Sequence, residues 1–244
     1  MKKILLLGMI LLMSLPMTLA SGSTQASLNG SSGIIYVPSA ETIPSGNILL
    51  GSWIFLDDPT SYAPRFLMSF IPNWELGLGV DISDYAENSF IINTKYKFYD
   101  AGVKVAIGFN YQNNGGPKDS DTQNENYQGY LSFTWAGYGK TSAFIGYTGG
   151  DDTNKDEIDF GIGFEKELFG GSGGALSLIF DFSNDNYRRI LGAMTGVGER
   201  QRGIFNIGAR VSALDNKLNF DFISVDMLDE AREWALSAAF RFGF

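Results

Sequence analysis

The C-terminal stretch Glu233-Trp-Ala-Leu-Ser-Ala-Ala-Phe-Arg-Phe-Gly-Phe244 decides the fold. Every second position from Trp234 to Phe244 is apolar, and Ser237, Arg241 and Gly243 are among the residues between them. This alternation is typical of a β-strand with one apolar and one polar face, because successive side chains point to opposite sides. A strand of this length that ends on an aromatic residue favours a membrane barrel over a soluble sandwich, whose strands are usually shorter.

The same two-residue period recurs upstream in segments that run about 9–12 residues, the length that a tilted strand needs to cross a bilayer. No stretch after residue 20 approaches the ~18 consecutive apolar residues of a transmembrane helix. Strands must therefore supply any membrane crossing. Within these segments the alternation is clearest at residues 74–82, 90–98, 101–111, 158–164, 176–182 and 205–211.

The connections between these segments alternate between short and long. Transmembrane barrels have short periplasmic turns and longer outer loops. Five short and six long connections predict an all-β fold, a transmembrane antiparallel up-and-down β-barrel of about 12 strands. The barrel is expected to span residues 46–244 and to lie in the bacterial outer membrane. The short connections are residues 72–73, 99–100, 136–140, 169–173 and 213–216, and the long ones are 57–63, 83–89, 112–126, 149–156, 184–202 and 226–232.

The first 20 residues have the pattern of a secretory signal peptide. Lys2 and Lys3 precede the apolar run from Ile4 to Leu15, and Thr18-Leu-Ala20 offers a small-residue cleavage site. Residues 21–45 then form an N-terminal periplasmic segment. We hypothesise that this segment enters the periplasmic mouth of the barrel as a small plug.

If the apolar alternate residues face lipid, the others face the lumen. The inward ionisable residues would be six acids and six bases, so the lumen is near neutral overall. Two interpretations remain open: a narrow polar channel, or cross-lumen salt bridges that fill the interior. The candidates are Lys95, Lys97, Lys104, Arg210, Arg241, Asp81, Asp159, Glu165, Asp181 and Asp221, together with Arg65 and Glu75.

The longest predicted loop differs from its acidic neighbours because it carries four arginines, Arg188, Arg189, Arg200 and Arg202. It is a candidate site for an anionic glycan or phosphate group. The alternative is that the loop folds inward onto lumen carboxylates.

The composition excludes several kinds of chemistry. The chain has no His and no Cys, so it lacks the usual general base of a membrane hydrolase and the usual ligands of a zinc site. We therefore predict that it is not an enzyme and has no cofactor or metal site. The 27 acidic residues exceed the 18 basic ones, which argues against nucleic acid as a partner. The expected partners are outer-membrane lipid and lipopolysaccharide, and the barrel-assembly machinery through the strand ending at Phe244.

The segment before the first strand, Gly33-Ile-Ile-Tyr-Val-Pro-Ser-Ala-Glu-Thr-Ile-Pro-Ser-Gly46, resembles the opening of the YjbH-like outer-membrane proteins associated with exopolysaccharide. In that family a Gly, two apolar residues, Pro-Ser-Ala and then Pro-x-Gly lead into strand one. The resemblance implies a barrel linked to polysaccharide export or envelope assembly, without a defined catalytic site. The alternative is a structural entry into the strand, because Pro fixes φ and Gly permits a tight turn. The matching residues are Gly33, Ile34, Ile35, Pro38, Ser39, Ala40, Pro44 and Gly46.

Two functions follow from these patterns. One is a narrow porin-like channel for small polar solutes. The other is a non-conducting structural or envelope-assembly barrel linked to exopolysaccharide export.

Overall fold

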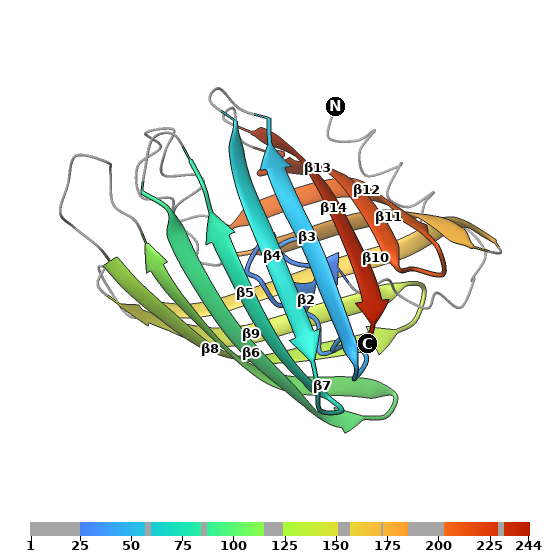
Figure 1. Cartoon of the computed structure of the whole chain (residues 1–244), viewed down its shortest axis with the longest axis horizontal. Helices are drawn as coiled ribbons and strands as arrows, with labels where there is room; N and C mark the ends of the chain where they lie inside the picture. Colours follow the sequence, from blue (N-terminus) through green and yellow to red (C-terminus); the bar gives the residue numbers. More distant parts are fainter. Residues whose placement is uncertain are drawn as a thin grey trace.

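Twelve antiparallel strands close into a barrel in the computed structural model, which describes residues 25–56, 60–83, 87–114, 124–150, 157–171, 173–184, 203–228 and 232–244 (Figure 1). Each strand pairs with its neighbours in sequence, and β14 closes the ring against β3. The predicted twelve-stranded up-and-down barrel is confirmed. The strands are β3 Asn47–Phe55, β4 Ser61–Ser69, β5 Trp74–Asp81, β6 Ser89–Asp100, β7 Val103–Asn114, β8 Asn124–Ala136, β9 Lys140–Gly150, β10 Glu157–Gly171, β11 Gly174–Ser183, β12 Ile204–Ala213, β13 Leu218–Val225 and β14 Glu233–Gly243.

The outer face of the barrel is apolar, as the alternation predicts. On β14, Trp234, Leu236 and Phe240 are exposed, whereas Ala235 and Ala239 between them are buried. Closure pairs the backbone groups of neighbouring strands, which hydrocarbon requires because it holds no water to satisfy free N–H and C=O groups. No helix in the described part of the chain is long and apolar enough to cross a membrane.

The connections at one end of the barrel are short. They are residues 70–73, 101–102, 137–139, 172–173 and 214–217. At the β4–β5 turn, Asn73 has φ 67°, the left-handed conformation that asparagine tolerates better than most residues. The chain end after β14 lies at this same end of the barrel (Figure 1).

Several predicted boundaries are wrong by a few residues. The proposed short turn 99–100 lies inside β6 and the observed turn is 101–102, while the proposed connections 83–89, 149–156 and 169–173 overlap the ends of β6, β9 and β10. The proposed long connection 112–126 begins and ends inside strands, because β7 continues to Asn114 and β8 starts at Asn124. Likewise β4 starts at Ser61, within the proposed connection 57–63. Polar residues extend these strands beyond the apolar band, so hydrophobic alternation alone underestimates their length. The proposed signal peptide, residues 1–20, lies outside the described residues.

Two β-bulges interrupt the alternation near the short turns. One lies between Lys97 and Tyr99 on β6, where the register against β7 shifts. The other lies between Glu167 and Phe169 on β10, opposite β11. Because a bulge inserts an unpaired residue and re-aims its neighbours, a strict two-residue period fails there.

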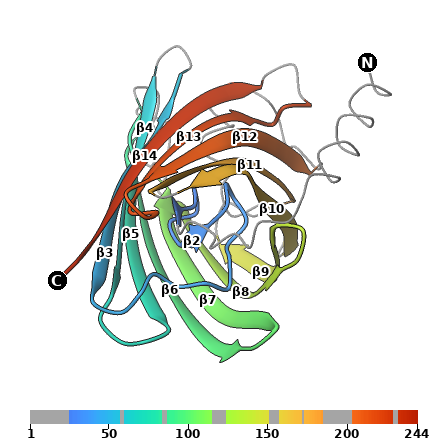
Figure 2. The same ribbon diagram turned by 90° about the vertical axis from the view of Figure 1, so that its right-hand side faces the viewer.

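The N-terminal segment lies inside the ring of strands (Figure 2). Every residue from Gln25 to Ala40 is buried. The short strands β1 Gln25–Ala26 and β2 Ser32–Gly33 pair only with each other among the described residues. The segment therefore occupies the lumen without adding a strand to the barrel.

The lumen wall is not polar throughout, which differs from the sequence-based expectation. Trp53 and Phe55 of β3 point inward and pack in one buried cluster with Leu28, Ile34 and other apolar residues of the segment. Both faces of β3 are thus apolar: one contacts lipid and the other contacts residues 25–45. Burial of this inner apolar surface favours docking of the segment.

Candidate functional site in the barrel lumen

Asp181 of β11 binds three consecutive backbone N–H groups of the segment. Its Oδ2 accepts hydrogen bonds from Ile35, Tyr36 and Val37 at 3.1, 2.6 and 3.0 Å, and its Oδ1 accepts one from Asn206 Nδ2 at 2.7 Å. Successive backbone N–H groups that converge on one anion form a nest, an established anion-binding arrangement. Here the barrel supplies the anion and the segment supplies the nest.

Glu75 of β5 binds the segment in a similar way. Its two carboxylate oxygens accept the N–H groups of Ser32 and Ile43 at 2.8 and 3.0 Å. The Lys95 ammonium group on β6 lies 3.4 Å from Glu75 and donates to the Ser32 carbonyl oxygen at 2.8 Å. Glu75 and Lys95 are both buried, so their pairing offsets part of the cost of removing two charges from water.

Two wall arginines bind carbonyl oxygens of the segment. Arg210 donates to the Ile34 carbonyl at 3.1 Å and forms two hydrogen bonds of 2.8 and 2.9 Å with Asp221. Arg65 donates to the Leu28 carbonyl at 2.8 Å and pairs with Asp81 at 2.7 Å. The wall thus presents acids to the N–H groups of the segment and bases to its carbonyl groups.

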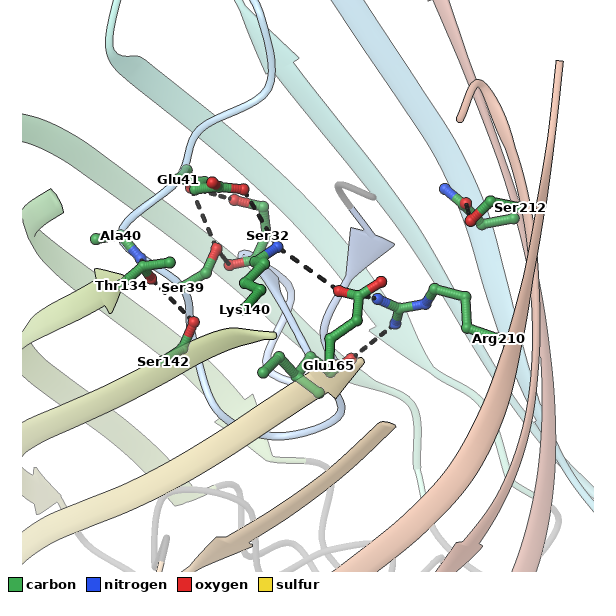
Figure 3. Close-up of polar contacts among 12 residues, drawn as sticks. Ser32, Ser39, Ala40, Glu41, Thr134, Lys140, Ser142, Glu165, Arg210 and Ser212 are labelled. Atoms are coloured by element: carbon green, nitrogen blue, oxygen red, sulfur yellow. Dashed lines mark hydrogen bonds and ion pairs between the residues drawn. The ribbon is translucent and has the colours of Figure 1, made fainter. Parts of the chain in front are cut away.

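Glu41 reaches from the segment to two lysines on the wall. Its carboxylate lies 2.8 Å from Lys104 Nζ and 3.2 Å from Lys140 Nζ. Figure 3 shows Lys140 near Glu41, with Glu165 beyond it at 3.8 Å. Glu41 lies between β2 and β3, outside the membrane-spanning strands. Burial opposes its ionisation, but Lys140 and Lys104 together outweigh burial and lower the pKa of this carboxyl group to about 2.

The wall of β6, β7 and β8 carries uncharged amides nearer the long loops. Asn93, Asn110 and Gln128 are cross-strand neighbours on the inner face, as are Gln112 and Asn126. The side chains of Asn93, Gln112 and Asn126 are buried and have no hydrogen-bond partner among the described residues. On β6 and β7, Lys95 and Lys104 therefore lie nearer the short turns, and the amides lie farther along the strands.

Most of the predicted lumen charges belong to pairs or clusters inside the barrel. Beyond the residues already described, Asp159 accepts hydrogen bonds from Gln128 at 2.6 Å and from Thr148, and Glu165 lies 3.3 Å from Arg210. Lys97 instead pairs with Asp100 at the short turn, because the β6 bulge ends the alternation there. Arg241 lies partly exposed near the end of β14.

The structure does not test the proposed anion-binding loop. Arg188, Arg189, Arg200 and Arg202 lie outside the described residues. The described residues contain no group of three or more His, Cys, Asp or Glu side chains placed to hold a metal ion.

Sequence reasoning missed two members of the site, Glu41 and Lys140. Glu41 is the one charged residue of the quoted segment 33–46, and its isolation among apolar and small residues was a usable signal. Lys140 follows a short turn and was assigned to the connection 136–140. The structure instead starts β9 at this residue.

The closed antiparallel ring and its apolar outer face define a class: this is a transmembrane β-barrel protein of the bacterial outer membrane. Both features meet the requirements of a bilayer, which only helices and closed barrels can span. The apolar band contacts outer-membrane lipid.

Comparison with solved structures agrees with this class. The chain is similar to the KdgM porin in complex with disordered oligogalacturonate, with a TM-score of 0.54 and 8% identity over 80% of this chain and 99% of that chain. It is also similar to the NanC porin, with a TM-score of 0.51 and 10% identity over 81% and 98% of the two chains. At such identities the likeness shows a shared fold. No protein-family model and no curated protein sequence matches this chain.

Proposed function

We propose that the protein is a porin-like channel for small polar solutes, and that residues 25–45 form a plug that closes it. The observation that carries the proposal is the inner wall of β6–β8, where Asn93, Gln112 and Asn126 are buried and have no hydrogen-bond partner in the part of the chain that the structure describes. Packed interiors leave few polar side chains unpaired. A row of such amides is typical of a surface that binds water or a polar solute. The shared fold with two porins supports the same function.

The plug is separable from the barrel wall. The ring from β3 to β14 is closed without it, since β1 and β2 pair only with each other among the described residues. The covalent link to β3 runs through Pro44, Ser45 and Gly46. Gly46 has φ 75°, a left-handed conformation that glycine adopts without strain. Displacement of the plug would therefore break side-chain contacts with the wall but no ladder of the barrel.

A second candidate is a non-conducting envelope-assembly barrel. The inner apolar cluster favours it, because Trp53 and Phe55 pack against Leu28, Ile34 and Ile35 with almost no exposed surface. Such packing is stable in the way a protein core is stable. The exopolysaccharide link implied by residues 33–46 stays a prediction.

A reversible disulfide distinguishes the two candidates. A Cβ placed on Gly163 of β10 lies 3.3 Å from Val37 Cβ in the plug, just below the ~3.5–4.5 Å that a disulfide requires. It also lies 2.8 Å from Ile34 Cδ1, so the end of that flexible side chain must shift. The native chain has no Cys, so the double variant Val37→Cys, Gly163→Cys forms no other bridge. Planar-bilayer conductance of the refolded protein is recorded in the oxidised and reduced states, with each single variant as a control.

A gated channel is silent when oxidised and shows ohmic openings when reduced. The single variants conduct alike in both states. Silence in both states, repeated in a variant that lacks residues 25–40, would refute the channel and support the non-conducting barrel. Equal conductance of the oxidised and reduced double variant would refute the plug as the gate.

A further inference from the structure

The contact between Glu41 and two wall lysines has the geometry of a ligand site. Lys104 donates to Oε1 and Lys140 approaches Oε2, at 2.8 and 3.2 Å. Each carboxylate oxygen of Glu41 thus faces one ammonium group, so the two lysines bind the two ends of a single carboxylate. The two lysines contact only the carboxylate oxygens of Glu41, so a free carboxylate in this position offers them the same two contacts.

The site is placed at the short-turn mouth of the lumen. Lys104 is two residues beyond the turn 101–102, and Lys140 directly follows the turn 137–139. The Lys104 side chain is 35% exposed and that of Glu41 is 20% exposed. A dissolved anion can thus reach Lys104 from the mouth, in contrast to the fully buried Glu75–Lys95 pair farther inside. Lys140 is buried while Glu41 is docked, with 5% of its side chain exposed.

The plug itself positions Glu41. The Glu41 carbonyl oxygen accepts a hydrogen bond of 2.6 Å from Ser32 Oγ, and the preceding Ala40 N–H donates to Thr134 Oγ1 at 2.8 Å (Figure 3). The low pKa of the Glu41 carboxyl group keeps it ionised at neutral pH. The carboxylate is therefore fixed by the docked plug and leaves the lysines when the plug leaves.

Departure of the plug would leave this mouth electropositive. Lys140 keeps Glu165 at 3.8 Å, but Glu165 also lies 3.3 Å from Arg210. Lys104 loses the carboxylate that it holds in the docked state. A vacated site with this excess of positive charge attracts anions.

We propose that Lys104 and Lys140 form a binding site for carboxylate-bearing solutes, and that Glu41 of the plug occupies this site in the closed barrel. The inference rests on the proposed channel and names its solute class. A solute carboxylate competes with Glu41 for the same two lysines. Because it binds only when Glu41 is absent, it shifts the population toward the displaced plug.

The test uses succinate as the probe and calorimetric titration of the refolded full barrel in detergent. Glu41→Gln removes the carboxylate that contacts Lys104 and Lys140 while preserving side-chain size. This variant is then combined with Lys104→Met, which removes half of the site, or with Lys97→Met as a matched control. Lys97 belongs to the same rim but pairs with Asp100. Neutral succinamide replaces succinate in a parallel titration, and heat-modified gel migration verifies folding of each variant.

We expect Glu41→Gln to bind succinate at least about tenfold more tightly than the native protein, equivalent to ~1.4 kcal/mol. Adding Lys104→Met abolishes the gain, adding Lys97→Met preserves it, and succinamide does not bind. Equal affinity of the native and Glu41→Gln proteins, or equal effects of Lys104→Met and Lys97→Met, would overturn the inference.

Conductance separates this inference from the channel itself. If Glu41→Gln binds succinate in this pattern while every form is silent in bilayers, the carboxylate site stands and the channel fails. If the barrel conducts but succinate binding is the same in all variants, the channel stands and the site is refuted.

Discussion

Asp181→Asn tests whether the wall carboxylate holds the plug. In the native protein one carboxylate oxygen accepts three backbone N–H groups of residues 35–37. A hydrogen bond to a charged acceptor contributes ~1.5–3 kcal/mol and a neutral one ~0.5–1.5 kcal/mol. The substitution keeps an oxygen of similar position but removes its charge, so each bond weakens by about 1 kcal/mol. Docking of the plug is then weakened by about 3 kcal/mol, which raises the ratio of displaced to docked plug roughly a hundredfold.

Hydrogen exchange measured by mass spectrometry on peptides covering residues 26–43 reports this equilibrium. We expect these amides to exchange roughly a hundredfold faster in Asp181→Asn, while amides of the barrel strands are unchanged. Asp159→Asn is the matched control, because Asp159 is equally buried but accepts its described hydrogen bonds from the wall residues Gln128 and Thr148. Exchange in Asp181→Asn that is unchanged or slower would refute the reasoning. It would show that the cost of burying the carboxylate cancels its hydrogen bonds.

Three further predictions concern other parts of the molecule. Because its pKa is lowered from 4.5 to about 2, Glu41 contributes to plug docking fully above pH 4.5 and loses this contribution as the pH falls toward 2. In that pH window, protection of the plug from hydrogen exchange should decline in the native protein but not in Glu41→Gln. Identical pH profiles of the two proteins would contradict the assignment. Ile162 lies on the lipid face and is 50% exposed, so Ile162→Arg should lower the free energy of unfolding in lipid vesicles by about 2–4 kcal/mol. Leu228 lies beyond the end of β13, and Leu228→Arg should lower it by about 1 kcal/mol or less. Equal costs for the two variants would place the apolar band elsewhere. Gly108→Ala puts a Cβ 2.1 Å from Cζ of Tyr130 on β8, whereas a Cβ on Gly129 of β8 meets nothing within 4 Å. In urea unfolding, Gly108→Ala should lower the free energy of unfolding by about 1–3 kcal/mol and Gly129→Ala should change it little. A Gly108→Ala variant as stable as the native protein would indicate a more loosely packed lumen.

The barrel could be predicted from the sequence because its two faces meet different solvents. One face of β14 meets lipid and the other meets the interior of the barrel. Large apolar side chains therefore recur at every second position or a multiple of it, as Trp234, Leu236 and Phe240 do. The alternation of short and long connections is likewise local, and it fixes the number of strands without knowledge of any long-range contact. Hydrophobic alternation failed at the bulges near Lys97 and Phe169, where the backbone and not the side chains changes the register, and on the inner face of β3, where Trp53 and Phe55 meet the plug.

The partners of the lumen charges were decided by the tertiary structure alone. Asp181 binds backbone N–H groups 144–146 residues away, and a backbone group leaves no mark in a sequence pattern. In the sequence, Trp53 and Phe55 make β3 apolar on both faces without an evident reason. The structure supplies the reason, because these inward side chains pack against the plug. The sequence by itself determined which residues face lipid, because that solvent acts on every strand in the same way. Which residues face the plug depended on where one non-repeating segment docks, and only the closed barrel specifies that place.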